Sequence, residues 1–270
     1  MRADDFHRYV AAFNAGDFEG FGAFYAPDVE FAGRGGNFRG WEAVLAFYRE
    51  VKSRVRHRLT VHGIVAGEQT IVVDMETELH ALDDWPDFAA GPLHKGETRR
   101  SQNFIWYDIQ DALFTRIRSA HYRRLAADER VVGTPATADE GMAAEQFASY
   151  IDAFNRDDYA AFGDCYLDDL VLVIAGKREL RGRQAIFDFY RAVKAQTRRT
   201  IEINKVVTVG NQLAAELQSE FVALQDLPEF AAGPLKRGGR IFINTVVLYE
   251  LRGGRFARIR SAELRKIVRD

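Results

Sequence analysis

The sequence contains one pattern twice, and this duplication limits what the chain can fold into more than any other feature. The segment 88–93, FAAGPL, returns 142 positions later, and the segment 116–120, RIRSA, returns at the same spacing. Solenoid repeats have periods of only about 20 to 50 residues, so a period of 142 residues indicates a duplicated domain. We predict one domain over residues 1–125, a linker over 126–141 and a second domain over 142–270, each long enough to bury its own core.

The composition is that of an ordinary globular protein and excludes several classes of function. There are 37 basic and 39 acidic residues, and no basic stripe that would bind nucleic acid. The single cysteine, Cys165, excludes an internal disulfide and a thiolate metal cluster. The N-terminus lacks the apolar core of a signal peptide, and no apolar run is long enough to span a membrane. We therefore expect a cytoplasmic protein that binds neither nucleic acid nor a membrane.

The two copies share one order of predicted elements. In copy one, apolar residues at helical or alternating spacing predict helices over 4–15, 18–25 and 40–51, a short strand over 29–32, and long strands over 58–66, 70–82, 99–109 and 113–123. Copy two repeats this order, with helices over 144–156, 158–166 and 183–195 and strands over 171–175, 200–209, 212–224, 240–251 and 255–266. Gly16 is expected to end the first helix, and Asp17 to cap the second. Helices that precede a long antiparallel sheet indicate an α+β domain, with the helices on one face of a curved sheet.

This order resembles the nuclear transport factor 2-like (NTF2-like) superfamily, and its SnoaL-like branch in particular. The resembling residues in copy one are Phe13-Asn14 with Asp17, the segment 25–29, Phe38-Arg39-Gly40, and the segment 114–118. Their counterparts in copy two are Phe154-Asn155 with Asp157, 166–170, 180–182 and 256–260. The resemblance implies a cone with a deep apolar pocket in each copy. Because single-domain members pair through their sheets, it also implies that the two cones pack as an intramolecular pseudo-dimer, and it leaves a further homo-oligomer open.

The same resemblance implies a chemistry without metal and without an organic cofactor. Enzymes of this family place a carboxylate or a histidine, with neutral hydrogen-bond donors, inside the apolar cone, where desolvation makes a carboxylate more basic and the donors stabilise an enolate. We therefore expect a lyase, isomerase, dehydratase or cyclase that moves protons on a small hydrophobic molecule, aromatic or carbonyl-bearing. A non-catalytic protein that binds a hydrophobic ligand in the same cone remains the alternative.

The two copies differ in the residues that could perform acid–base chemistry. All six histidines and all three tryptophans lie in copy one, which favours copy one as the active cone. His121 lies two residues after Ser119 on the last predicted strand, so the two side chains share a face, and we expect His121 to be the acid or base. The equivalent residues in copy two are Glu263 and Ser261. The alternative interpretation of His121 is a histidine at the rim of the strand.

Two further strands carry candidates. On the strand 70–82, Glu76 and Glu78 are alternate bases, or else they belong to a solvated strand face. Asn103, on the strand 99–109, is expected to orient the substrate together with Ser119, because an asparagine on a buried face must be hydrogen-bonded.

Aromatic residues complete the set of candidates. Tyr9 and Trp106 are predicted to contact the substrate. The loop 84–93 is interpreted as structural, because both copies keep it. His57 and His62 are five residues apart on one strand and therefore on opposite faces, which argues against joint metal ligation.

Overall fold

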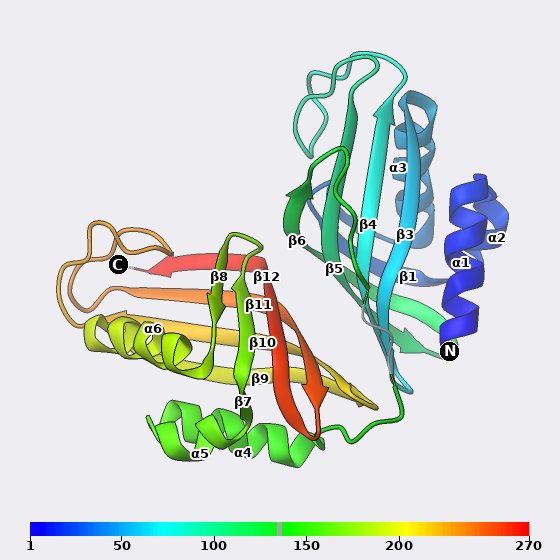
Figure 1. The fold of residues 1–270 in the computed structure, drawn as a ribbon. Helices are drawn as coiled ribbons and strands as arrows, with labels where there is room; N and C mark the ends of the chain where they lie inside the picture. The colour runs from blue at the N-terminus through cyan, green and yellow to red at the C-terminus, as the bar shows by residue number, and fades with distance from the viewer. Residues whose placement is uncertain (134–136, 270) are drawn as a thin grey trace. The chain divides into compact units, whose positions relative to one another are not determined.

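The computed structural model describes residues 1–133 and 137–269, so residues 134–136 of the predicted linker lie outside the described residues. Its internal contacts divide the chain into two units, residues 1–135 and 136–270. Each unit is an α+β domain with helices along one face of a curved antiparallel sheet and a hydrophobic core of its own, as expected (Figure 1). The packing of the two cones as a pseudo-dimer stays a prediction.

The first unit contains three helices and six strands: α1 (Ala3–Ala15), α2 (Phe18–Gly22), β1 (Tyr25–Gly33), β2 (Gly36–Arg39), α3 (Trp41–Arg54), β3 (Val55–Ala66), β4 (Thr70–Ala81), β5 (Thr98–Gln110) and β6 (Leu113–Leu125). Strands β3, β4, β5 and β6 form an antiparallel meander. Strand β1 then pairs parallel with β6 and antiparallel with β2.

The second unit repeats this topology with α4 (Ala144–Asn155), α5 (Tyr159–Asp164), β7 (Tyr166–Ile174), β8 (Arg178–Arg181), α6 (Arg183–Gln196), β9 (Thr197–Val209), β10 (Gln212–Ala223), β11 (Arg240–Arg252) and β12 (Arg255–Arg269). Strand β7 pairs parallel with β12 and antiparallel with β8, as β1 does with β6 and β2. The duplication seen in the sequence is therefore a duplication of the complete fold.

The ends of the first two helices follow from local chemistry. Helix α1 ends at Ala15 because Gly16 adopts a left-handed conformation with φ of 73°, which a glycine adopts without steric cost. The Asp17 side chain caps α2 by accepting a hydrogen bond from the backbone nitrogen of Gly20 at 2.8 Å. Both predicted ends are confirmed.

The repeated Phe-Asn pair fastens the first helix of each unit to the sheet. Asn14 donates a hydrogen bond to the carbonyl oxygen of Leu59 on β3 and accepts one from the Leu59 nitrogen, both at 2.8 Å. Asn155 makes the same two bonds with Ile201 on β9 at the same distances. The asparagine amide thus imitates one residue of a neighbouring strand and positions the helix along the sheet, with Phe13 or Phe154 buried beside it.

The structure adds a hairpin that the sequence prediction lacks. A strand was expected over residues 29–32 alone, whereas β1 spans Tyr25–Gly33 and turns back as β2. The turn contains Arg34 and Gly35, and Gly36 follows with φ of 136°, which only glycine adopts readily. This β1–β2 hairpin forms one wall of the cavity described next.

Candidate functional site

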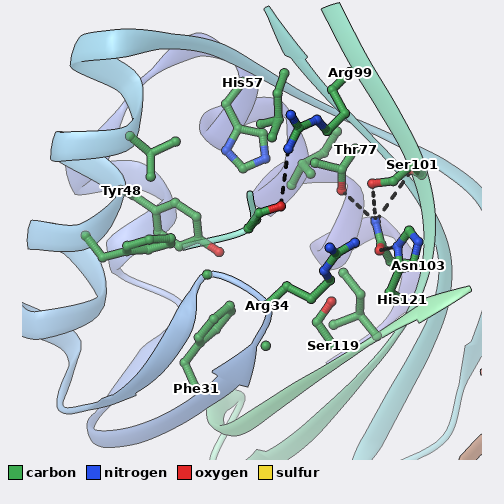
Figure 2. Close-up of a pocket in the computed structure, with 18 of the residues that line it drawn as sticks. Phe31, Arg34, Tyr48, His57, Thr77, Arg99, Ser101, Asn103, Ser119 and His121 are labelled. Carbon is green, nitrogen blue, oxygen red and sulfur yellow. Dashed lines mark hydrogen bonds between the residues drawn. The ribbon is translucent and has the colours of Figure 1, made fainter. Parts of the chain in front are cut away.

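A cavity of about 490 Å³ lies inside the first unit, on the helical side of the sheet (Figure 2). This volume is within the range of small-molecule sites, about 300 to 1,000 Å³. Aromatic and aliphatic side chains from α1, α3 and the β1–β2 hairpin form much of its wall. The non-aromatic polar residues that line it are Arg34, His57, Thr77, Arg99, Ser101, Asn103, Ser119, His121 and Arg124. None of the described lining residues is an aspartate or a glutamate.

Strand alternation decides which side chains of the sheet reach the cavity. Residues of the same parity face it, so Thr77 on β4, Ser101 and Asn103 on β5, and Ser119 and His121 on β6 all line it. The pairing of β5 with β6 shifts between Gln102 and Asn103, which leaves Asn103 directly opposite His121. A β-bulge of this kind re-aims side chains and is common beside active sites.

A chain of hydrogen bonds joins these residues. The amide nitrogen Nδ2 of Asn103 donates to Thr77 Oγ1 and to Ser101 Oγ, both at 3.1 Å, and reaches the Ser101 carbonyl oxygen at 3.5 Å. Because a carbonyl oxygen can only accept, this side of the amide carries the NH₂ group. Asn103 is only 8% exposed, so its orientation is fixed by these partners.

The same orientation fixes the tautomer of His121. The Asn103 oxygen Oδ1 lies 3.3 Å from Nδ1 of His121 and can only accept, so Nδ1 carries the proton. In the neutral ring the lone pair is then on Nε2, which is the basic nitrogen. The predicted residues His121, Asn103 and Ser119 are therefore brought together at one wall of the cavity.

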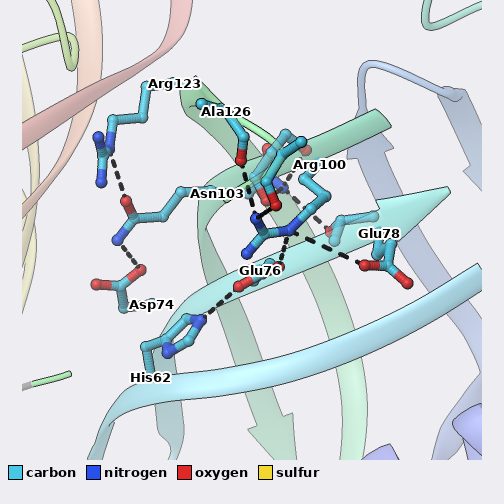
Figure 3. A network of polar contacts seen from close by, with 12 residues as sticks. His62, Asp74, Glu76, Glu78, Arg100, Asn103, Arg123 and Ala126 are labelled. Atoms are coloured by element: carbon cyan, nitrogen blue, oxygen red, sulfur yellow. Dashed lines mark hydrogen bonds and ion pairs between the residues drawn. The ribbon is translucent and has the colours of Figure 1, made fainter. Parts of the chain in front are cut away.

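The predicted alternate bases Glu76 and Glu78 do not line the cavity, which corrects the expectation. Figure 3 shows them in a polar network with Arg100 and His62. The two glutamates alternate with Thr77 and therefore project from the opposite face of β4. Glu76 forms ion pairs with Arg100 at 2.7 Å and with His62 at 2.9 Å. Burial raises the pKa of this carboxyl, but hydrogen bonds from Arg100 and His62 outweigh burial and hold it below its usual value.

This ionic cluster holds the chain that leaves the first unit. Arg100 donates from Nη1 to the carbonyl oxygens of Ala126 and Ala127, at 2.9 and 3.0 Å. Glu78 lies 3.9 Å from Arg100, with its side chain 41% exposed. The two carboxylates thus belong to the outer face of the sheet and to the anchoring of the segment after β6.

Of the two aromatic residues predicted to contact the substrate, Tyr9 lines the cavity and Trp106 does not. Trp106 does not line the cavity, because it alternates with Tyr107, and its indole nitrogen donates to Asp108 at 2.9 Å. Tyr9 lines the cavity, but its hydroxyl lies 3.0 Å from that of Tyr25, and burial raises the pKa of Tyr9 to about 12. The second unit repeats this hydroxyl pair at 2.9 Å, so we interpret Tyr9 as scaffold.

His57 is a lining residue that the sequence interpretation missed as part of the site. It lies near the start of β3 and packs edge-on against Phe13, with ring centroids 4.9 Å apart. Burial, followed by the nearby Lys52 charge, lowers the pKa of His57 to about 3, so the ring is neutral. Neither ring nitrogen has a hydrogen-bond partner among the described residues. The sequence does contain one signal that His57 is special: the two copies differ at this position, because Arg199 occupies the equivalent place in the second unit.

The repeated loop after β4 forms part of the cavity wall. Phe88, Ala90, Gly91 and Pro92 line the cavity, and Arg99 holds them there. Its guanidinium donates to the carbonyl oxygens of Ala90 at 3.2 Å, Gly91 at 3.1 Å and Pro92 at 2.5 Å. The structural interpretation of this loop was therefore incomplete in the first unit, because here the loop also closes over the cavity.

The second unit carries different groups at the equivalent places. Thr245 pairs with Glu263 across β11 and β12, again next to a register shift, and Glu263 is exposed. Ser261 is half-buried on the same strand. The Arg199 guanidinium lies over three aromatic rings at 5.0 to 5.5 Å and fills the space that corresponds to His57.

In the described ranges, no three His, Cys, Asp or Glu side chains are close enough together to hold a metal ion. No helix in the described part of the chain is long and apolar enough to cross a membrane.

Comparison with known proteins agrees with this architecture. The profile of the SnoaL-like domain matches twice, at residues 6–117 and 147–259. A search of curated proteins gives no match. Similar solved structures include a putative polyketide cyclase from Silicibacter sp., with 24% identity and a TM-score of 0.39, aligned over 44% of this chain and 86% of that one. Another is a putative polyketide cyclase from Xanthomonas campestris, with 21% identity, a TM-score of 0.39 and coverage of 43% and 86%.

An LEH-like epoxide hydrolase of M. tuberculosis is similar over 44% of this chain and 80% of its own, with 15% identity and a TM-score of 0.37. These likenesses concern the fold, and each covers less than half of this chain. The two profile matches span most of the sequence, one in each unit. The chain therefore belongs to the SnoaL-like family and carries two copies of its domain.

Proposed function

We propose that the cavity of the first unit is the active site of a cofactor-independent lyase, isomerase, dehydratase or cyclase. The substrate is a small hydrophobic molecule with an aromatic ring or a carbonyl group. His121 moves the proton, and Asn103 and Ser119 orient the substrate. One observation carries this proposal: His121 is hydrogen-bonded to Asn103 in a largely apolar cavity whose described lining contains no carboxylate. The histidine is then the group there best suited to proton transfer near neutral pH.

The geometry supplies the parts that such a step needs. The Asn103 oxygen holds Nδ1 of His121, so that Nε2 is the nitrogen that takes a proton, and a base oriented by a third group is the arrangement that proton transfer favours. Hydroxyl groups of Ser101 and Ser119 line the same wall and can donate to an enolate oxygen. The apolar remainder of the cavity strengthens these interactions, because few competing waters fit beside a bound ring.

Proton transfer can be measured before the natural substrate is known. We expect the protein to accelerate exchange of the α-protons of aromatic ketones, with 1-tetralone as the reference compound, in deuterated buffer followed by NMR. Binding of several such ketones in the cavity without accelerated exchange on any of them would favour the alternative function, a protein that only binds hydrophobic ligands. Absence of both binding and exchange would contradict the proposal and its alternative together.

A further inference from the structure

The charged side chains that line the cavity of the first unit are all arginines. Three arginines line it, namely Arg34, Arg99 and Arg124, and none of the described lining residues is acidic. Two of these arginines are partly neutralised by Glu97, which lies 3.1 Å from Arg99 and 3.5 Å from Arg124. The guanidinium of Arg99 also binds the loop carbonyls, so its donors are already in use.

Arg34 differs from the other two arginines. It lies in the turn of the β1–β2 hairpin and points into the cavity between Phe31 and Ser119 (Figure 2). No described residue forms an ion pair or a hydrogen bond with its guanidinium. Its five N–H donors are therefore available to a ligand, and a guanidinium matches a carboxylate with two parallel hydrogen bonds.

Arg34 is an exposed residue, but the backbone of the turn that carries it is held by its neighbours. Gly35 lies against the ring of Phe47, where an added Cβ would come within 2.6 Å of the ring. The Phe47 ring in turn stacks on Phe38 of β2, with centroids 4.7 Å apart, and packs near Phe31. The hairpin that carries Arg34 is thus held by an aromatic cluster at the cavity wall. A ligand that pairs with Arg34 has aromatic rings beside it.

We propose that the first unit takes an aromatic carboxylic acid as substrate or ligand, with the carboxylate bound by Arg34 and the ring among Phe31, Phe47 and Phe88. This inference rests on the proposed function only in that the same cavity binds a ligand. The carboxylate lies at the hairpin, and the hydrophobic body of the ligand reaches the wall of Asn103 and His121. In the second unit the corresponding turn is Ala175-Gly176-Lys177, with a glycine 142 positions after Arg34.

A matched pair of probes tests this inference by isothermal titration calorimetry on the full chain. We expect 2-naphthoate to bind the wild-type protein about tenfold more tightly than the neutral 2-naphthamide of the same shape, as one charge-assisted pair provides. Arg34→Gln should bring the ratio of the two affinities to about one, and Arg34→Lys should keep part of the preference. Retained binding of 2-naphthamide shows that the variant is folded.

The control variant is Arg39→Gln, which removes the same charge from an exposed position on β2 outside the cavity lining. It should leave the preference for 2-naphthoate unchanged. The inference is overturned if wild-type protein does not prefer 2-naphthoate, if Arg34→Gln keeps the preference, or if Arg39→Gln loses it equally. Tighter binding of 2-naphthyl phosphate than of 2-naphthoate would overturn the assignment to carboxylates. Because binding is measured without turnover, these results are independent of proton exchange on 1-tetralone.

Discussion

The Nδ1 atom of His121 lies 3.3 Å from the Oδ1 atom of Asn103, across a bulge in the pairing of β5 with β6. This contact orients the imidazole of His121, which lines the cavity. The equivalent pair in the second unit is Thr245 and Glu263, which keeps the bulge and lacks the histidine. The same bulge in the strand pairing thus places a histidine in the first unit and a glutamate in the second.

The contact predicts how substitutions of Asn103 affect proton exchange. Asn103→Leu removes the acceptor that holds Nδ1–H, so we expect the exchange rate on 1-tetralone to fall about 10- to 100-fold, with the protein still folded. Asn103→Asp keeps an acceptor toward Nδ1 and can accept from the Thr77 and Ser101 hydroxyls, and should retain most of the rate. Equal losses in both variants would indicate that Asn103 only supports packing.

The contacts of Arg99 predict a change in the loop that closes the cavity. Arg99→Met removes the donors to the carbonyl oxygens of residues 90–92, and we expect faster hydrogen exchange in the loop 84–93 together with several-fold weaker ligand binding. Arg124→Met is the matched control, because Arg124 also lines the cavity and pairs with Glu97 but makes no such contact with the loop. Unchanged loop exchange in Arg99→Met would contradict this role.

The neutral state of His57 predicts a pH dependence of stability. Its pKa is about 3 in the folded protein and about 6.5 when unfolded, so between these values only the unfolded state binds a proton. Stability is therefore complete above pH 6.5 and is lost as the pH falls, by up to about 1.4 kcal/mol per pH unit. In His57→Phe this loss disappears, because phenylalanine keeps the aromatic packing and does not titrate.

Urea denaturation at pH 7 and at pH 5 measures this difference. The free energy of unfolding of the wild-type protein should fall by about 2 kcal/mol more than that of His57→Phe over this interval, because only the part below pH 6.5 contributes. The other histidines are present in both proteins and cancel in the comparison. A smaller loss in the wild-type protein than in the variant would mean that His57 is charged and paired in the folded state.

The sequence was sufficient for the fold and for one wall of the cavity. Repetition located the two domains, and strand alternation correctly put Ser119 on the face of His121. The same alternation, read with hydrophobicity, also determines the outcome for Glu76. Val73, Met75 and Leu79 are apolar and face the core, which leaves Glu76 on the opposite face of β4, where it is buried with its ion-pair partners.

Other parts of the site could not be read from the sequence. The bulge that places His121 opposite Asn103 depends on a shift in pairing, and residue periodicity does not reveal such a shift. His57 resembles any histidine on a strand until its lack of partners is seen in three dimensions. The hairpin containing Arg34 has four residues in its second strand, too few for a periodic signal, although Gly35-Gly36 marks a turn.

The most direct test of the central claim compares His121→Ala with Glu263→Ala in the exchange assay on 1-tetralone. If the first unit holds the active cone, His121→Ala should lose about 10²- to 10⁴-fold of the accelerated rate, as expected for removal of a positioned acid or base. Glu263→Ala should keep most of the rate, and both variants should melt near the wild-type temperature. A large loss in Glu263→Ala, or an unchanged rate in His121→Ala, would contradict the assignment of proton transfer to the first unit.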